Sequence, residues 1–178
     1  MPTMNFESAE SNKIQIRPFV MDDMNKVIAL RLEARQAEPH IFPRSYEKEA
    51  ATSNEAWLER FEKTRGANPT SLLELAWNGD ELIGMAGARQ VEPGKWDLHG
   101  VYVRMLQRGN KTGPKLVKEL MRKIKLRGDV RRIEFNALVG NDRAVHMYQE
   151  LGFTIVGTER SKMGDGREHG KFIFRMDL

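Results

Sequence analysis

The chain has 178 residues, a net charge of +4 and no cysteine. A chain of this length forms one domain and buries about 70% of its extended-chain surface, so its core needs neither a disulfide nor a metal. The missing cysteine excludes a disulfide framework, a cysteine-based zinc site and a thiol nucleophile. The longest non-polar run, residues 82–88, is too short to span a bilayer, and residues 1–12 lack the features of a secretion signal. We therefore expect a cytoplasmic protein without a membrane partner.

Residues 1–12 are predicted to form a flexible leader, and residues 13–178 a single domain. Within the domain, apolar residues recur at every second position in the predicted strands and at helical spacing in the predicted helices. In chain order we expect a strand at 14–17, helices at 22–39 and 45–64, a hairpin of strands at 72–77 and 81–91, a strand at 96–104, a helix from Pro114, a strand at 132–139, a helix at 142–151, and a closing hairpin of strands at 153–163 and 168–176.

The connections between these strands predict how they pair. Tight turns join the hairpins, so most neighbouring strands run antiparallel. A helix connects the strand at 96–104 to the strand at 132–139, and a crossover of this kind makes two strands parallel. The predicted fold is an α/β domain of the α+β type, in which helices flank a mixed, mostly antiparallel sheet with one central parallel strand pair.

The first strand of that parallel pair leads into the turn Gln107-Arg108-Gly109-Asn110-Lys111-Thr112-Gly113 and then into a helix. The N–H groups at the start of a helix are unpaired and carry the positive end of the helix dipole, so they attract anions. A turn rich in glycine and small polar residues at this place therefore predicts an enzyme that binds a phosphorylated cofactor.

Basic residues gather between Lys115 and Arg132. The simplest interpretation is the solvated face of a helix and the turn after it. Attraction of an anionic cofactor and binding of nucleic acid are the alternatives. No aromatic residue lies among these charges to provide the stacking surface that single-strand binders use, so we expect no nucleic-acid partner.

Two motifs resemble those of the GNAT superfamily of N-acetyltransferases. Gly100-Val101-Tyr102-Val103, followed by Arg108-Gly109 and Gly113, is similar to the acetyl-CoA motif of that family. Asn141-Asp142-Arg143-Ala144, with Tyr148 and Leu151-Gly152-Phe153, is similar to its second motif. The chain departs from the family pattern at Lys111, where a glycine is expected, although a lysine ammonium is able to pair with phosphate.

The resemblance implies a parallel strand pair that opens at an acetyl-CoA site, with acetyl-CoA as cosubstrate and no metal. It also implies direct transfer of the acetyl group to a primary amine in a ternary complex, which agrees with the missing cysteine. The acceptor would be a protein N-terminus or lysine, a polyamine or another small amine, and the protein a monomer or homodimer. The alternatives are a non-catalytic acyl-CoA-binding relative and, less favoured, a basic nucleic-acid-binding protein.

By the same resemblance, backbone groups of Val101 and Val103 pair with the pantetheine arm. The turn at residues 108–113 holds the pyrophosphate through its N–H groups. Asn141 contacts the cofactor as well, although an asparagine before a helix is also a common cap, and the two roles are compatible. The expected cofactor-binding residues are Val101, Val103, Arg108, Gly109, Asn110, Lys111, Thr112, Gly113 and Asn141.

Tyr148 would donate a proton to the leaving thiolate, again by resemblance, whereas helical spacing alone indicates a core tyrosine. For the general base we favour Asp97, followed by His99 and Glu134, and for each of them a surface or paired role is an equally good interpretation. Two-residue alternation places Asp97, His99 and Val101 on one face of their strand. Candidates to line the acceptor pocket are Phe42, Tyr46, Trp57 and Trp96.

Overall fold

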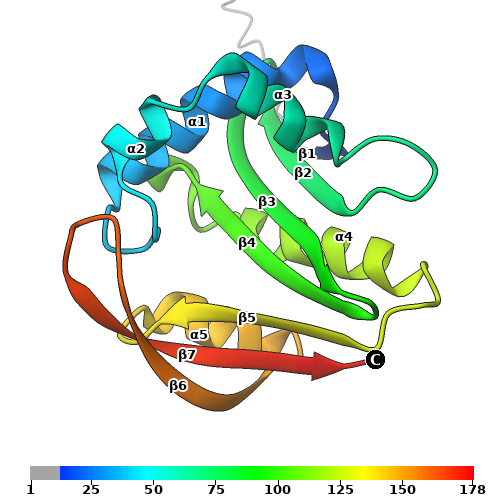
Figure 1. Ribbon diagram of the computed structural model, residues 1–178, viewed down its shortest axis with the longest axis vertical. Coiled ribbons are helices and arrows are strands. Elements are labelled where there is room, and N and C mark those ends of the chain that lie inside the picture. The colour runs from blue at the N-terminus through cyan, green and yellow to red at the C-terminus, as the bar shows by residue number, and fades with distance from the viewer. Residues whose placement is uncertain (1–12) are drawn as a thin grey trace, which may run out of the picture.

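The computed structural model describes residues 13–178, so the leader predicted for residues 1–12 lies outside the described residues. The described part is built on a seven-stranded sheet with helices on both faces (Figure 1). Its elements are β1 (Gln15–Pro18), a 3₁₀ turn (Met21–Asp23), α1 (Met24–Ala37), α2 (Tyr46–Ala50), α3 (Asn54–Glu62), β2 (Ser71–Asn78), β3 (Glu81–Glu92), β4 (Lys95–Val103), a second 3₁₀ turn (Met105–Gln107), α4 (Thr112–Lys125), β5 (Arg132–Leu138), α5 (Asp142–Glu150), β6 (Thr154–Lys162) and β7 (Glu168–Asp177).

The strands lie in the order β1-β2-β3-β4-β5-β7-β6. Neighbouring strands are antiparallel except for β4 and β5, which are parallel and are connected through α4. This topology confirms the predicted mixed, mostly antiparallel sheet and its parallel pair. None of the described helices is long and apolar enough to cross a membrane.

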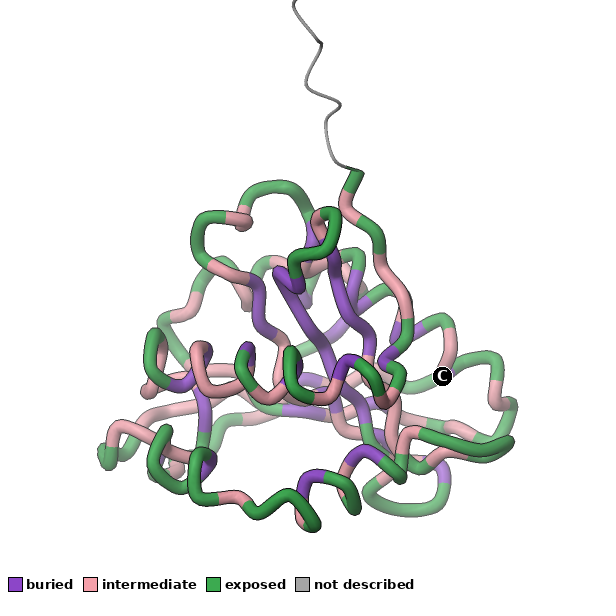
Figure 2. The backbone as a smooth tube through the Cα atoms, turned by 90° about the horizontal axis from the view of Figure 1, so that it is seen from above, coloured by how far each residue is buried: buried purple, intermediate pink, exposed green. Residues whose placement is uncertain are grey.

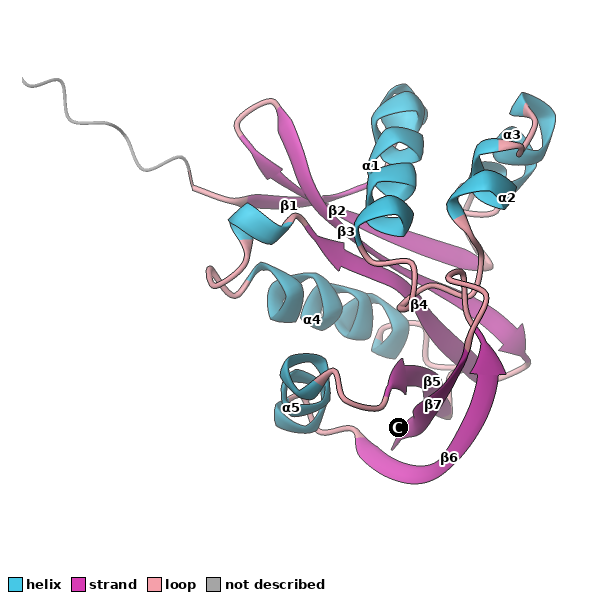
Figure 3. Ribbon diagram, turned by 90° about the vertical axis from the view of Figure 1, so that its left-hand side faces the viewer, coloured by secondary structure: helices cyan, strands magenta, loops and turns pink. Residues whose placement is uncertain are grey.

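The helices divide between the two faces of the sheet, with α1, α2 and α3 on one side and α4 and α5 on the other (Figure 3). The apolar residues that predicted α4 are buried against the sheet as expected: Leu116, Val117, Leu120, Met121 and Ile124. They form one core cluster with Trp96 and Phe174, while Trp57 and Phe61 belong to a second cluster under α1. Buried residues follow the central strands between the helical layers (Figure 2).

Two helix predictions are corrected by the structure. The single helix expected from Ser45 to Thr64 is two short helices, α2 and α3, separated by residues 51–53. The side chains of Ser45 and Ser53 each accept a hydrogen bond from an N–H three residues on, at 3.4 and 3.3 Å, so each serine caps a new helix. The helix expected from Pro114 begins at Thr112, which places Pro114 within its first turn.

The turn between β6 and β7 touches the loop between α1 and α2, as Figures 1 and 3 show. The Gly164 N–H donates to the carbonyl oxygen of Phe42 at 2.7 Å. A Cβ at Gly164 would lie 2.9 Å from the carbonyl oxygens of Phe42 and Pro39 and 3.0 Å from that of Arg44. Only a residue without a side chain allows this backbone-to-backbone contact, which we call the loop clasp.

Gly164→Ala is expected to force the loop clasp apart, because its methyl group would meet three backbone oxygens. We expect the free energy of unfolding to fall by about 1–3 kcal/mol, as for other overpacked sites. Gly170→Ala is the matched control, since a Cβ there would lie 3.5 Å from Val139, at ordinary contact distance. Equal urea-unfolding curves for the two variants would show that the clasp is not a tight contact.

Candidate functional site

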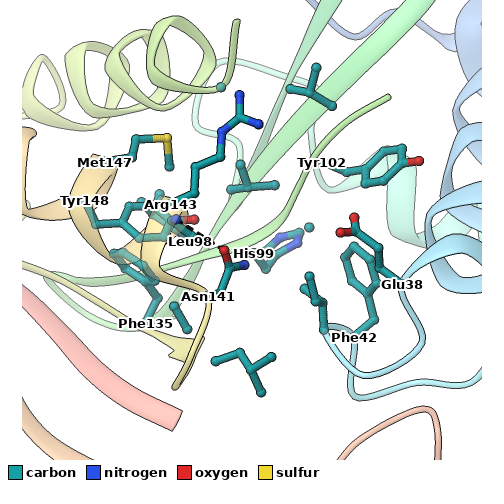
Figure 4. Close-up of a pocket in the computed structure, with 18 of the residues that line it drawn as sticks. Glu38, Phe42, Leu98, His99, Tyr102, Phe135, Asn141, Arg143, Met147 and Tyr148 are labelled. Carbon is teal, nitrogen blue, oxygen red and sulfur yellow. Dashed lines mark hydrogen bonds between the residues drawn. The ribbon is translucent and has the colours of Figure 1, made fainter. Parts of the chain in front are cut away.

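The site is a cavity that opens where β4 and β5 separate. These strands pair only at Lys95–Arg132 and Trp96–Ile133, near the start of each strand. Beyond those pairs the structure has a cavity of about 510 Å³ between them. A volume of this size suits a small-molecule ligand. Figure 4 shows Tyr148 and Phe135 on one side of the cavity and Phe42 and Glu38 on the other, with His99 between them.

A bulge in β4 shapes the cavity wall. Met85 pairs with Tyr102 and Gly87 with His99, so one residue of β3 lies opposite both Gly100 and Val101. Gly100 adopts a φ of +62°, the left-handed conformation that a glycine takes at the first position of such a bulge.

The bulge corrects the expected alternation along β4. Val101 packs with the core under α4, whereas His99 faces α1, as its electrostatic interaction with Arg31 and Arg35 indicates. The extra residue changes the phase between His99 and Val101, so the two side chains lie on opposite faces.

The predicted phosphate turn ends at the start of α4, with Lys111 as the residue before the helix. Lys111 has φ +57° and ψ +21°, so it occupies the left-handed region in which glycine is normally found. The N–H groups of the first helical turn have no intrahelical partner. Lys111, Thr112 and Gly113 line the cavity, and Gly113 lies against α5, because a Cβ there would be 3.5 Å from the sulfur of Met147.

Arg108 also lines the cavity, but its polar groups already have partners within the protein. Its guanidinium forms an ion pair with Glu38 at the end of α1, and its Nε donates to the Val103 carbonyl oxygen at 2.9 Å. Its backbone N–H donates to Met105. Arg108 therefore joins the turn to α1, and the unpaired N–H groups lie further along, at the start of α4. Gly109 lines the cavity, whereas Asn110 does not.

Asn141 both caps α5 and lines the cavity, as the two compatible interpretations allowed. Its side-chain oxygen accepts from the Ala144 N–H at 3.3 Å. Arg143, in the first turn of α5, is exposed and lines the cavity as well. Arg143 belongs to the second sequence motif, but no role was predicted for it, although a cation beside a predicted phosphate site was a sufficient signal.

Tyr148 is buried and lines the cavity next to three phenylalanines. Its ring centroid lies 4.5 Å from that of Phe135 and 5.4 Å from that of Phe174. Burial raises the pKa of the Tyr148 phenol, so this group stays protonated at neutral pH. Tyr148 is thus a core residue and a cavity residue at once, and the two interpretations of its position do not conflict.

The three candidate bases differ in position. Asp97 and His99 line the cavity, whereas Glu134 lies outside it, in ion pairs with Lys95 at 3.0 Å and Arg175 at 2.8 Å. Burial raises the pKa of Asp97, although the Arg89 guanidinium, 3.0 Å away, acts in the opposite direction. For His99, burial together with the charges of nearby arginines lowers the pKa to about 3, so its ring is neutral.

Only one of the four aromatic candidates for the acceptor pocket lines the cavity. Phe42 does so, while Trp57 and Trp96 are buried in the two core clusters and Tyr46 is partly exposed on α2. The prediction was wrong for these three residues because helical and strand spacing do not distinguish a core face from a pocket wall. Among the described residues, no group of three or more His, Cys, Asp or Glu side chains is placed to hold a metal ion.

Comparison with known proteins agrees with this geometry. The model of the acetyltransferase (GNAT) family matches residues 31–153. This chain therefore belongs to the GNAT acetyltransferase family. No curated protein matches the chain.

Solved structures share the fold at low sequence identity. A GNAT acetyltransferase from Streptococcus pneumoniae is 19% identical with a TM-score of 0.80, and the match covers 93% of this chain and all of that one. A ribosomal-protein-alanine N-acetyltransferase from Brucella melitensis is 20% identical with a TM-score of 0.76, over 92% and 99% of the two chains. A spermidine N-acetyltransferase from Vibrio cholerae, solved with CoA and spermine, is 16% identical with a TM-score of 0.71, over 93% and 95%.

Gly87→Ala tests the position of His99, because a Cβ at Gly87 would lie 2.5 Å from Cε1 of the His99 ring. We expect the ring to be displaced towards solvent and its pKa to rise towards the ordinary value, with a stability loss of about 1–3 kcal/mol. Gly157→Ala is the control, since a Cβ there would have its nearest contact at 3.4 Å.

The measurement is a pH titration of the histidine Cε1–H signals by NMR between pH 5 and 8. The unmodified His99 signal should not move in this range, because a pKa of about 3 keeps the ring neutral throughout. A wild-type His99 that titrates near pH 6.5 would contradict its half-buried position facing Arg31 and Arg35.

Proposed function

We propose that this protein is an acetyl-CoA-dependent N-acetyltransferase that transfers an acetyl group directly to a primary amine in a ternary complex. One observation carries this proposal. The start of α4, whose unpaired N–H groups suit a phosphate, lines the same cavity as the buried, protonated phenol of Tyr148. Membership of the GNAT acetyltransferase family supports the same reaction.

The residues around the cavity fit acetyl-CoA. The unpaired N–H groups at the start of α4, with the cations of Lys111 and Arg143, would hold the phosphates. The free edge of β4 at Val101 and Val103, beyond its last pair with β5, would hold the pantetheine arm. When bound, acetyl-CoA supplies an acetyl group already activated by its bond to sulfur.

Tyr148 is the group that we assign to protonation of the leaving thiolate. Its raised pKa keeps the proton on the phenol until a thiolate forms, and the same apolar surroundings disfavour the thiolate charge. The second tyrosine of the cavity wall, Tyr102, is less suited, because its hydroxyl already donates to Glu33 at 3.2 Å.

We assign the general base to Asp97 in preference to His99 and Glu134. A base must lie within reach of the amine that it deprotonates, which disfavours Glu134 outside the cavity. It must also bind a proton near neutral pH, which disfavours His99 with a pKa of about 3. Burial moves the pKa of Asp97 upwards, in the direction that a base requires.

Tyr148→Phe should lower kcat on the order of 10²-fold while the affinity for acetyl-CoA stays nearly constant. Thiol release from acetyl-CoA across a panel of amines measures the first quantity, and calorimetry measures the second. Tyr102→Phe serves as the comparison and should have a much smaller effect, since its hydroxyl is held by Glu33. Unchanged turnover in Tyr148→Phe would remove the assigned role, and cofactor binding without turnover on any amine would favour a non-catalytic relative.

Lys111→Gly and Lys111→Ala separate the two properties of this residue. Both variants lose the charge, so both should bind acetyl-CoA about tenfold more weakly. Only glycine relieves the left-handed backbone, so Lys111→Gly should be more stable than Lys111→Ala by about 1 kcal/mol. Lys118→Ala, at an exposed position of α4, is the control for the change in charge. Equal affinity of Lys111→Gly and the unmodified protein would show that the ammonium does not contact the cofactor.

A further inference from the structure

Four arginines from the α1–α3 layer surround one buried carboxylate. The nearest nitrogens of Arg31 and Arg35 lie 2.7 and 3.2 Å from the carboxylate of Glu49, and those of Arg44 and Arg60 lie 3.4 and 3.9 Å away. The Glu49 side chain is fully buried. One carboxylate cannot balance four guanidinium groups, so this group, which we call the arginine cluster, carries excess positive charge.

The arginine cluster lies directly behind one wall of the cavity. Nη1 of Arg31 is 3.7 Å from the position that a Cβ would take at Gly100, and Gly100 lines the cavity without a side chain to cover it. The guanidinium of Arg35 lies over the ring of Phe42, another wall residue, 5.1 Å from its centroid.

The excess charge affects one buried group, Arg35, and one half-buried group, His99. The Nε of Arg35 is buried and has no hydrogen-bond partner among the described residues, although its side chain is 6% exposed. Burial and then the charge of Arg31 lower the pKa of Arg35 to about 10. On the cavity side, the charges of Arg31, Arg89 and Arg35 add to burial in lowering the pKa of His99.

Among residues 13–178, the cavity wall has no free carboxylate to offset this field. Its two acidic residues among those described are Glu38 and Asp97, and each is held by an arginine, Arg108 and Arg89 respectively. Lys171, across the cavity on β7, also lines the wall, but its ammonium is paired with Glu159 at 2.8 Å. A polycationic acceptor would therefore meet positive charge without an available counter-charge, whereas an anionic group would be attracted.

The loop clasp borders the same end of the cavity. Phe42 and Met163 both line the cavity, and the hydrogen bond from Gly164 to Phe42 joins the two segments that carry them. A total volume of about 510 Å³ must hold the reactive end of the cofactor as well as the acceptor. The space beside His99 therefore suits a small molecule better than an extended peptide.

We infer that the acceptor is a small primary amine that carries an anionic group, a carboxylate or phosphonate, which binds beside Gly100 towards Arg31. This inference rests on the proposed function and adds the substrate class. Arg31 is a binding residue in this scheme, with the other arginines of the cluster setting the sign of the field. Polyamines, aminoglycosides and protein N-termini are excluded as preferred acceptors.

The test compares acceptors that differ only in the anionic group: an amino acid with its amide, and an aminoalkyl phosphonate with the corresponding amino alcohol. Spermidine and an N-terminal hexapeptide complete the panel. We expect kcat/KM for each anionic amine to exceed that of its neutral partner at least tenfold. The comparison with the amide is conservative, because the amide has the less basic amine and hence more neutral nucleophile.

Arg31→Gln should raise KM for the anionic amine about tenfold and leave KM for acetyl-CoA unchanged, while Arg31→Lys should retain most of the preference. Glu49 keeps three arginine partners in the variant, so folding should persist, which circular dichroism checks. Arg65→Gln removes the same charge from an exposed pair with Glu62 and serves as control. Calorimetric binding of the N-acetylated acid and its amide gives a readout that does not need turnover.

The outcomes separate this inference from the proposed function. Turnover with a preference for the neutral partner, spermidine or the peptide overturns the inference and leaves the acetyltransferase proposal standing. A preference for the anionic amine that Arg31→Gln does not reduce overturns the assigned binding residue. No turnover of any amine, with acetyl-CoA bound or not, overturns the proposed function and this inference with it.

Discussion

The early end of pairing between β4 and β5 is the constraint on which the site depends. Two parallel strands held by only two residue pairs, at Lys95 and Trp96, leave backbone groups further along β4 without a strand partner on that side. Buried N–H and C=O groups need partners, so this edge favours water or a ligand that presents amides of its own. The starts of α4 and α5 border the same opening, which brings unpaired N–H groups to the ligand that fills it.

Electrostatics then distinguishes the two ends of the cavity. At one end, Lys111 and Arg143 stand beside helix starts, a setting for phosphate. At the other end, burial and then the charges of the arginine cluster behind His99 keep its ring neutral. The ion pair of Arg108 with Glu38 connects the two ends, since it ties the phosphate turn to the end of α1. The wall is therefore organised before any ligand arrives, which reduces the entropy lost on binding.

Periodicity predicted the regular parts of this molecule well, because burial of one face has a repeating signature. The apolar positions of α4 and the closing hairpin follow that rule, and so does the crossover that makes β4 and β5 parallel. The resemblance of the turn and of the segment around Tyr148 to known motifs supplied part of the cavity lining.

The features that were missed depend on single residues or on distant contacts. Nothing periodic marks the bulge at Gly100, so Val101 was placed on the wrong face. Ser53 was the signal for the break between α2 and α3, but it lies within a run that otherwise reads as helical. The pairing of Glu38 with Arg108 joins residues 70 positions apart, and charge alone does not select one partner among many.

The bulge at Gly100 also limits how the length of β4 can vary. If one residue were deleted there, β4 would form a regular ladder with β3, in which His99 still pairs with Gly87 and Tyr102 with Met85. Side chains on both sides of the deletion would keep their faces, so Trp96 and Leu98 would stay in the core. Exchange of Gly100 for another residue would strain the backbone locally, whereas loss of a residue would remove the local bend that the bulge gives this wall of the cavity. Relatives of this protein that keep the cavity are therefore expected to conserve the number of residues between Trp96 and Tyr102 more strictly than their identities.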